Sequence, residues 1–425
     1  MTITFKYKEL VAILTEVATV IDESLANEDM KNIIFEINNG VLHIITTSTS
    51  IVYKRNVDEE IYTIEGNEDE YTLEDNNKVF RFQLRSKELL NFLNTYKNLK
   101  RTQAEEVKFV TKENLRVECY VVEKEIVKDT EEDITEDSNE IGFLTEKQET
   151  EPKVNKRKGF VSKSKWVFTS SVMKLSILNS IRQKVDDNAK EIEIKGTDIA
   201  YHTKNMLQVV SSKIPTYSYT LFDKEYVLGF NPAYTTVMKN QLNKDGIFED
   251  MKLSYKAVQF FDKILSKNET IKVIKTETHL CVKTENSVSF IIYEVKMPNY
   301  KPYIDMFTKN FYISLDKLFL KDVLKRLSLL KETIEFDVDV PNRVINLSNS
   351  KFSQPIIINH SYNMDDRHFK FKIMPDILTK AISCSNYEED NNELRLYYCP
   401  NETTTILVFT DAEGTWFTAA KVAIY

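Results

Sequence analysis

Lysines recur at helical spacing in the segment 315–330, where Lys317, Lys321 and Lys325 are four residues apart. Apolar residues fill the other side of the segment with a period close to that of an α-helix, and these are Leu315, Leu318, Phe319, Val323, Leu324, Leu327 and Leu330. The pattern predicts an amphipathic helix that packs through its apolar face and presents ammonium groups to an anion such as phosphate. A merely solvated helix face would carry the same residues, so one helix does not decide the chemistry.

The combination of an apolar face and basic residues recurs in further predicted helices, at 6–20, 86–100, 171–184, 254–267 and 375–384. The candidate residues for contact with an anionic backbone are Lys8, Lys87, Arg101, Lys174, Arg182, Lys256, Lys263, Lys267, Lys317, Lys321, Lys325 and Lys380. The net charge is −8, so basic residues can serve a nucleic acid only if they are sorted onto one surface. No aromatic stripe accompanies them, which argues against stacking on single-stranded bases and favours sequence-independent contact with duplex DNA.

The sequence patterns do not indicate an enzyme. Glycine is scarce, at eight residues, and none lies in a spacing typical of phosphate-binding loops. The histidines are scattered, and we interpret them as strand or loop residues rather than ligands; they are His43, His202, His279, His360 and His368. The four cysteines, Cys119, Cys281, Cys384 and Cys399, are far apart, which predicts buried thiols in a reducing compartment. We therefore expect neither catalysis nor a metal or cofactor.

The composition is that of a globular protein with a sizeable core, with 425 residues of which 42% are hydrophobic and 29% charged. No run approaches the roughly 18 apolar residues of a membrane-spanning helix, and the N-terminal segment lacks the pattern of a signal peptide. These features predict a cytoplasmic protein with no membrane partner. Asn, Lys, Ile and Glu dominate the composition, which suggests an AT-rich genome such as that of a phage.

The predicted helices alternate with sets of short strands, which indicates an α+β fold. The clearest strand pair is 33–37 with 41–46, joined by a turn at Asn38-Asn39-Gly40, and a further strand is predicted at 208–213. Two helices and an antiparallel strand set recur three times, so we predict three repeated domains. We place these domains at 1–123, 166–300 and 301–425, with a charged linker or insertion at 124–165 and an additional insertion at 230–250.

Three segments resemble the sliding clamp of bacterial replicative DNA polymerase, the beta processivity subunit. MPNYKPYI at Met297–Ile304 resembles the family's Phe-Pro-Asp-Tyr linker between the second and third domains. SLDKLFLKDVLKRLSLL at Ser314–Leu330 resembles the opening helix of the third domain, and WFTAAKVAIY resembles the strand on which clamps end. The resemblance covers most of the chain and is best from Ser254 onward.

The resemblance implies the DNA clamp fold, in which three repeated clamp-like domains each pack two helices on antiparallel sheets. It also implies a homodimeric ring around double-stranded DNA, with a clamp loader and a DNA polymerase as partners. The family holds partner peptides between domains two and three, and by position this pocket would involve Met206, Leu207, Pro298, Tyr300, Tyr303, Val422 and Ile424. The family's Thr-Asp-Gly-His-Arg segment is here at best Ala-Tyr-His-Thr-Lys-Asn, at Ala200–Asn205. The family's Met-Pro-Met-Arg ending is here Lys-Val-Ala-Ile-Tyr.

The alternative is a structural or interaction protein that shares the clamp fold without encircling DNA, such as a virion component or a replication inhibitor. Such a protein has no reason to sort ammonium groups onto helix faces. The lysine stripes at 254–267 and 315–330 therefore favour a DNA sliding clamp that tethers a replicative polymerase as its processivity factor.

Overall fold

The structure is a computed structural model, and it describes residues 1–66, 70–99, 102–113, 115–125, 161–182, 185, 189–211, 213–214, 218–231, 234–243, 245–295, 312–363, 366–383, 392–399, 405–411 and 416–424. The chain divides into two compact units. The first contains Met1–Thr46 and Arg55–Leu178, and the second contains Thr47–Lys54 and Asn179–Tyr425.

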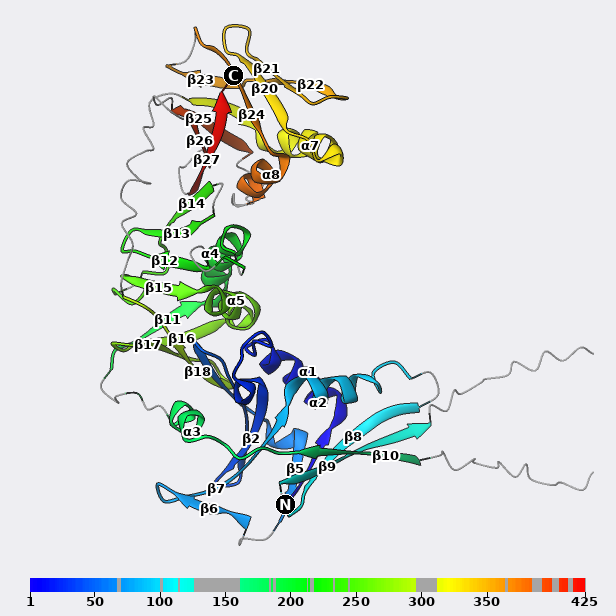
Figure 1. Ribbon diagram of the computed structural model, residues 1–425. Helices are drawn as coiled ribbons and strands as arrows, with labels where there is room; N and C mark the ends of the chain where they lie inside the picture. The colour runs from blue at the N-terminus through cyan, green and yellow to red at the C-terminus, as the bar shows by residue number, and fades with distance from the viewer. Residues whose placement is uncertain are drawn as a thin grey trace, which may run out of the picture. The chain divides into compact units, whose positions relative to one another are not determined.

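The first unit consists of antiparallel strands and two long helices (Figure 1). Its strands are β1 (Thr2–Lys6), β2 (Asn32–Asn38), β3 (Val41–Thr47), β5 (Tyr62–Glu65), β6 (Thr72–Glu74), β7 (Asn77–Arg85), β8 (Thr102–Thr111), β9 (Arg116–Glu125) and β10 (Val161–Thr169). Its helices are α1 (Tyr7–Ala18) and α2 (Ser86–Asn94), with 3-10 helices η1 (Glu28–Lys31) and η2 (Glu59–Ile61); α3 (Leu175–Ile181) contains the boundary of the unit. One sheet has the order β10-β9-β8-β1-β5, and β3-β2-β7-β6 are consecutive strands of another.

Phenylalanines from both strand sets form the core of the first unit. Phe35 on β2 and Phe82 on β7 stack with their ring centroids 4.8 Å apart, and Phe35 lies 5.3 Å from Phe109 on β8. Phe5, Phe35 and Phe109 are fully buried. Because alternate residues of a strand point to the same face, these positions bring the inner faces of the two strand sets together.

The second unit contains the remaining strands: β4 (Ile51–Asn56, which contains the boundary), β11 (Glu191–Lys195), β12 (Tyr219–Phe222), β13 (Tyr226–Phe230), β14 (Tyr234–Lys239), β15 (Met251–Ser254), β16 (Thr270–Lys275), β17 (His279–Lys283), β18 (Ser287–Ile292), β19 (Tyr312–Asp316), β20 (Ile334–Asp339), β21 (Val344–Ser348), β22 (Ser353–Ile357), β23 (His360–Tyr362), β24 (His368–Ile373), β25 (Glu393–Cys399), β26 (Thr405–Asp411) and β27 (Trp416–Ile424). Its helices are α4 (Gly196–Val209), α5 (Tyr255–Lys263), α7 (Lys317–Leu327) and α8 (Pro375–Ser383), with 3-10 helices η5 (Leu265–Lys267) and η6 (Ser328–Leu330). The helices lie on one side of the strands (Figure 1).

A sheet of 13 strands runs through the second unit, with β15-β12-β13-β14-β27-β24-β20-β21-β22 as its main path. The pairing of β14 with β27, in which Tyr234 lies opposite Ala420, joins strands that are far apart in the sequence. Helices contact each other in pairs, α1 with α2 in the first unit and α4 with α5 and α7 with α8 in the second. The repeated arrangement of two helices on antiparallel sheets confirms the predicted α+β fold class.

Several predicted elements are confirmed at the level of single residues. The turn of the β2–β3 hairpin has φ of 50° at Asn39 and 85° at Gly40, as an Asn-Gly turn requires. Helix α1 buries Leu10, Leu14 and Val17, which follow its predicted apolar face. The predicted helices at 254–267 and 375–384 correspond to α5 with η5 and to α8.

Two predictions about the second unit are wrong. Residues 208 and 209, which we predicted to begin a strand, end helix α4, and the region 196–207 was not recognised as helical. The segment 230–250 is not an insertion, since it supplies β14, which pairs with both β13 and β27 inside the large sheet. The domain boundaries stay a prediction. Among the described residues, none of the helices is long and apolar enough to cross a membrane.

Candidate nucleic-acid interface

Three lysines of the second unit gather where α4, α5 and η5 meet. Lys204 on α4, Lys263 on α5 and Lys267 on η5 are all exposed, and each one interacts electrostatically with Asp262. Partial burial raises the pKa of the Asp262 carboxyl above its usual value, and the three ammonium groups oppose that shift. We call Lys204, Lys263 and Lys267 the α4–α5 lysine cluster. Of its members, sequence reasoning identified Lys263 and Lys267 and missed Lys204.

Close backbone packing fixes the two helices that carry this cluster. A Cβ atom at Gly196, the first residue of α4, would lie 2.0 Å from the carbonyl oxygen of Asn268, so only glycine allows α4 to start against the end of η5. Ser254 caps α5, because its Oγ accepts a hydrogen bond of 3.2 Å from the backbone N–H of Ala257. The backbone positions of the lysines are therefore fixed, while their aliphatic side chains remain flexible.

Polar residues on the buried face of α4 explain why the helix was missed. Ile199, Met206 and Val209 are buried at helical spacing, but His202 and Thr203 lie between them on the same face. The Thr203 hydroxyl donates to the carbonyl of Ile199 at 2.9 Å. His202 Nδ1 lies 2.9 Å from the carbonyl oxygen of Asp198. The spacing of the three apolar residues is the signal that could have identified the helix.

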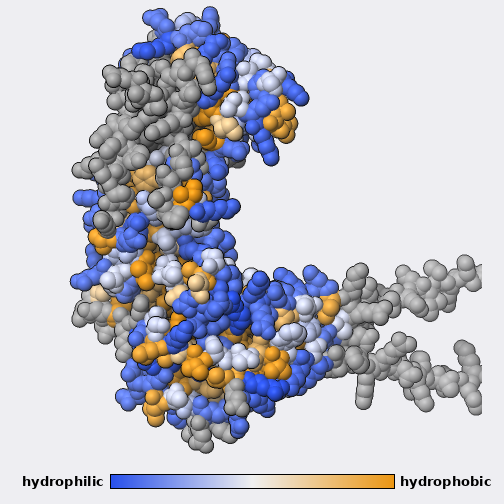
Figure 2. All heavy atoms as spheres, viewed as in Figure 1, coloured by the Kyte–Doolittle hydropathy of each residue, from blue (hydrophilic) through white to orange (hydrophobic). Residues whose placement is uncertain are grey.

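The lysine stripe predicted on 315–330 is only partly exposed. Lys317 is 4% exposed, whereas Leu318 and Phe319, which we predicted to be buried, are 45% and 42% exposed. The prediction of one clean apolar face and one clean basic face is therefore wrong for the first turn of α7. Figure 2 shows hydrophobic residues at the surface over α7. Lys321 is half-buried and Lys325 exposed, and the Lys325 ammonium lies 3.0 Å from a carboxylate oxygen of the exposed Asp322.

The structure places the other predicted basic residues in varied surroundings. Lys8 on α1, Lys87 on α2 and Lys380 on α8 are exposed, and Lys256 on α5 is half-buried. Lys174 precedes α3 and forms an ion pair with Asp29 within the first unit. Arg182 is exposed just after α3. Arg101 lies outside the described residues.

The predicted partner-peptide pocket stays a prediction, and the described residues locate four of its seven members. Met206 is fully buried within α4, where its Sδ would be 3.1 Å from a Cβ atom at Gly229, and Leu207 is half-buried. Val422 and Ile424 belong to β27 and pair with Thr405 and Phe371 respectively. The remaining three members, Pro298, Tyr300 and Tyr303, lie outside the described residues.

Burial shifts the pKa values of several titratable side chains. Burial raises the pKa of the Cys281 thiol to about 11 and also raises the pKa of Cys119, and both thiols are free and buried as predicted. Cys399 is on β25, and Cys384 lies outside the described residues. No group of three His, Cys, Asp or Glu residues suited to a metal ion occurs in the described part of the chain. His202 is buried, and burial lowers its pKa.

Comparison with solved structures relates the whole chain to bacterial clamps. The sliding clamp of Bacillus subtilis has a TM-score of 0.69 and 12% sequence identity, and the match covers 100% of this chain and 99% of that one. The chain has the sliding-clamp fold. A putative DNA polymerase III beta subunit of Eubacterium rectale matches with a TM-score of 0.67 at 13% identity over 100% and 99% of the two chains.

A third matching structure is a clamp with a bound peptide. The Helicobacter pylori beta clamp, bound to a DNA ligase peptide, has a TM-score of 0.66 and 14% identity, and the match covers 100% of both chains. No protein-family model matches this chain, and no curated protein matches its sequence. The clamp fold is therefore established by three-dimensional similarity, which fits the resemblance first seen in Met297–Ile304 and Ser314–Leu330.

Proposed function

We propose that this protein is a DNA sliding clamp, which encircles duplex DNA as a homodimeric ring and tethers a replicative DNA polymerase as its processivity factor. The observation that carries the proposal is the α4–α5 lysine cluster, which places three exposed ammonium groups on the helices of a clamp fold. Lys8, Lys87 and Lys380 are exposed on the corresponding helices of the other repeats and support it.

Lysines on flexible stems suit the contacts that sliding requires. An ammonium group attracts phosphates and releases counterions without reading the base sequence, so each contact can break and re-form as the protein moves. A closed ring stays on DNA through its topology, and it therefore needs only weak contacts. The protein would act without catalysis or a cofactor, in the cytoplasm, with a clamp loader to open the ring and a polymerase peptide bound between its second and third domains.

An exposed apolar pair after α7 supports self-association. Leu329 and Leu330 on η6 are 80% and 37% exposed. Apolar side chains exposed next to each other favour burial against a protein partner. We propose that a second copy of the chain covers them in the ring.

The second candidate is a clamp-fold interaction protein that does not encircle DNA. It is favoured by the first turn of α7, where Leu318 and Phe319 are exposed and Lys317 is buried. In a duplex-binding surface those exposed positions would be expected to carry cations.

Retention on circular and linear DNA tests the proposal. The protein is loaded onto nicked circular duplex, with a clamp loader if required, and separated by size at moderate salt before and after the circle is linearised. Retention on the circle with loss from the linear form is expected. Equal retention on both forms would indicate ordinary electrostatic binding, and retention on neither would favour the interaction protein; each of these results would overturn the proposal.

A further inference from the structure

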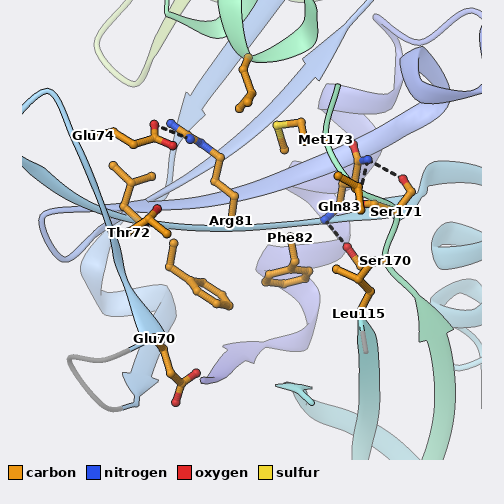
Figure 3. Close-up of a pocket in the computed structure, with 14 residues that line it drawn as sticks. Glu70, Thr72, Glu74, Arg81, Phe82, Gln83, Leu115, Ser170, Ser171 and Met173 are labelled. Atoms are coloured by element: carbon orange, nitrogen blue, oxygen red, sulfur yellow. Dashed lines mark hydrogen bonds and ion pairs between the residues drawn. The ribbon is translucent and has the colours of Figure 1, made fainter. Parts of the chain in front are cut away.

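The first unit contains a groove along β7 that DNA contact does not explain (Figure 3). Two adjoining cavities of about 340 Å³ and 560 Å³ form it. The lining residues that they share are Glu70, Phe80, Arg81, Phe82, Leu115 and Ser170. We call this feature the β7 groove; the segment 170–173 forms one wall of its smaller cavity.

Apolar side chains dominate the floor and the rim of the groove. Phe82 is fixed from below by its stacking on Phe35, and the ring of Phe80 lies 6.2 Å from that of Phe82. Val172 and Leu115 at the rim are 73% and 46% exposed. A concave apolar floor with exposed apolar residues beside it favours burial of an apolar ligand group.

A buried amide in the wall has one unused hydrogen-bonding atom. Gln83 is 1% exposed, and its backbone N–H donates to Ser170 Oγ at 3.1 Å. Its Nε2 donates to the carbonyl oxygen of Ser171 at 3.2 Å, whereas Oε1 is buried without any hydrogen-bond partner. An unpaired buried acceptor has lost its hydrogen bonds to water without gaining others, so an N–H group of a bound ligand would relieve that cost.

The charged groups of the groove nearly balance and are partly paired with one another. The carboxylates are Glu70, Glu74 and Glu113, and the cations are Arg81, Lys112, Arg116 and the N-terminal ammonium of Met1, which pairs with Glu70. Arg81 is moreover paired with Glu36 at 2.6 Å and with Glu74 at 2.7 Å. A strongly charged ligand would therefore gain little here, and a neutral one fits the groove better.

We propose that the β7 groove binds a short, neutral, extended peptide segment of a partner protein. The segment buries an apolar side chain against Phe80 and Phe82 and donates a backbone N–H to Oε1 of Gln83. Both interactions belong to the recognition of extended peptides, in which pockets take side chains and polar groups of the site pair with the peptide backbone. The groove lies within one compact unit, so the proposal does not depend on encirclement of DNA.

The methyl group of Met173, which lines the groove, provides a local probe. The full-length protein is labelled with 13C at its methionine methyl groups, and the variant Met173→Leu assigns the signal. Blocked neutral octapeptides with a central Leu-Phe, Leu-Leu or Ile-Phe pair in a Gly/Ser background are titrated in, beside peptides with central Ser-Ser, Lys-Lys or Glu-Glu pairs. We expect at least one apolar peptide to shift the Met173 signal saturably, and the polar and charged peptides to leave it unchanged.

The variant Val172→Asp places a carboxylate on the exposed rim without disturbing the core, and it should weaken binding by about tenfold or more. The matched control Ile357→Asp, at a position on β22 that is 72% exposed, should bind as the wild type does. No shift with any apolar peptide, or an equal affinity in Val172→Asp, would overturn the proposal. So would an equal response to N-acetyl-leucinamide at the same concentration, which would indicate a small-molecule site. Retention on circular DNA is measured separately and is unaffected by either result.

Discussion

The α4–α5 region and the α7 region carry similar numbers of basic residues but present them differently. Around α5 the lysines Lys263 and Lys267 are exposed and are joined by Lys204 from α4. On α7 the predicted stripe begins with Lys317, which is 4% exposed, while Leu318 beside it is 45% exposed. Spacing along a helix therefore does not decide which face is solvated; the rotation of the helix against its sheet does.

The rotation of α7 follows from the way the helix starts. Lys317 comes directly after β19, and its backbone N–H donates to the carbonyl oxygen of Asn392 at 2.9 Å. In α1, α2 and α4 the first residue also follows a strand directly and is buried, as Tyr7, Ser86 and Gly196 respectively. At these four junctions the first position of the helix still lies within the strand layer and is covered whatever its polarity; at the start of α5, which follows β15 directly, Tyr255 is half-buried.

Reversing one charge on α7 tests this difference most severely. Lys317→Glu should lower the free energy of unfolding by about 4 kcal/mol, because it places a carboxylate in a buried site occupied by an ammonium group. Lys325→Glu should change it by less than about 0.5 kcal/mol, because that residue is exposed. Denaturant unfolding of both variants provides the measurement. Equal effects of the two substitutions would mean that Lys317 and Lys325 are equally exposed to solvent.

Reversal of the α4–α5 lysine cluster should weaken duplex binding. The triple variant Lys204→Glu, Lys263→Glu, Lys267→Glu should lower affinity by about 100-fold and reduce the slope of log affinity against log salt by about 3, because three ammonium groups no longer release counterions. The corresponding triple reversal on α7, at Lys321, Lys325 and Arg326, should lower the affinity for duplex DNA by a smaller factor.

A matched control for net charge is the triple Lys224→Glu, Lys331→Glu, Lys351→Glu, whose members are exposed in the second unit and lie outside helices and strands. Fluorescence anisotropy with a labelled duplex at several salt concentrations gives the affinity and its salt dependence for each of the three triple variants. If the control loses as much affinity as the cluster variant, net charge and not the cluster governs binding.

The Gly196→Ala variant should unfold more readily than the wild type, by about 2 kcal/mol, because its added methyl group meets the backbone of Asn268 and not a movable side chain. Thr197→Ala, at the next and exposed position, should be close to neutral. Thermal unfolding compares the two, and a neutral Gly196→Ala would show that α4 and η5 separate easily. Weaker duplex binding by Gly196→Ala in its folded state would link this contact to the lysine cluster.

The wild-type protein should lose a small part of its stability in mild acid through His202. Burial lowers the folded-state pKa of His202 below the usual histidine value of about 6.5, so neutral His202 contributes its full stability above about pH 6.5. That contribution is lost as the pH falls from about 6.5 through the folded-state pKa, at no more than about 1.4 kcal/mol per pH unit.

Unfolding free energies at pH 8, 6.5 and 5 for the wild type and His202→Leu give the test. The difference between the two proteins should shrink toward low pH. A constant difference would show that His202 does not titrate differently in the folded and unfolded states.

The smallest expected effect on stability is that of Leu329→Asp, which should disrupt only the association of two subunits. Leu329→Asp should leave the unfolding free energy within about 0.5 kcal/mol of the wild-type value, since the side chain is 80% exposed. Light scattering should report a halved mass at micromolar concentration. An unchanged mass, with the wild type dimeric, would place the subunit contact elsewhere.

The sequence by itself determined the elements whose patterns are local. The Asn39-Gly40 turn, the apolar stripes of α1 and α5 and the Pro375 start of α8 each rest on residues within one turn or one hairpin, where steric and hydrophobic preferences act directly. The short linker and helix motifs also sufficed to suggest the clamp fold.

Only the tertiary structure decided the features that depend on distant partners. The helical state of 196–209 requires polar His202 and Thr203 to find hydrogen-bond partners in a buried face, and β14 becomes part of the sheet through β27. Lys317 is buried because α7 begins inside the strand layer, and Gln83 Oε1 is left unpaired by the wall built from Ser170 and Ser171. Such outcomes depend on which surfaces meet across the fold, and local periodicity carries no information about that.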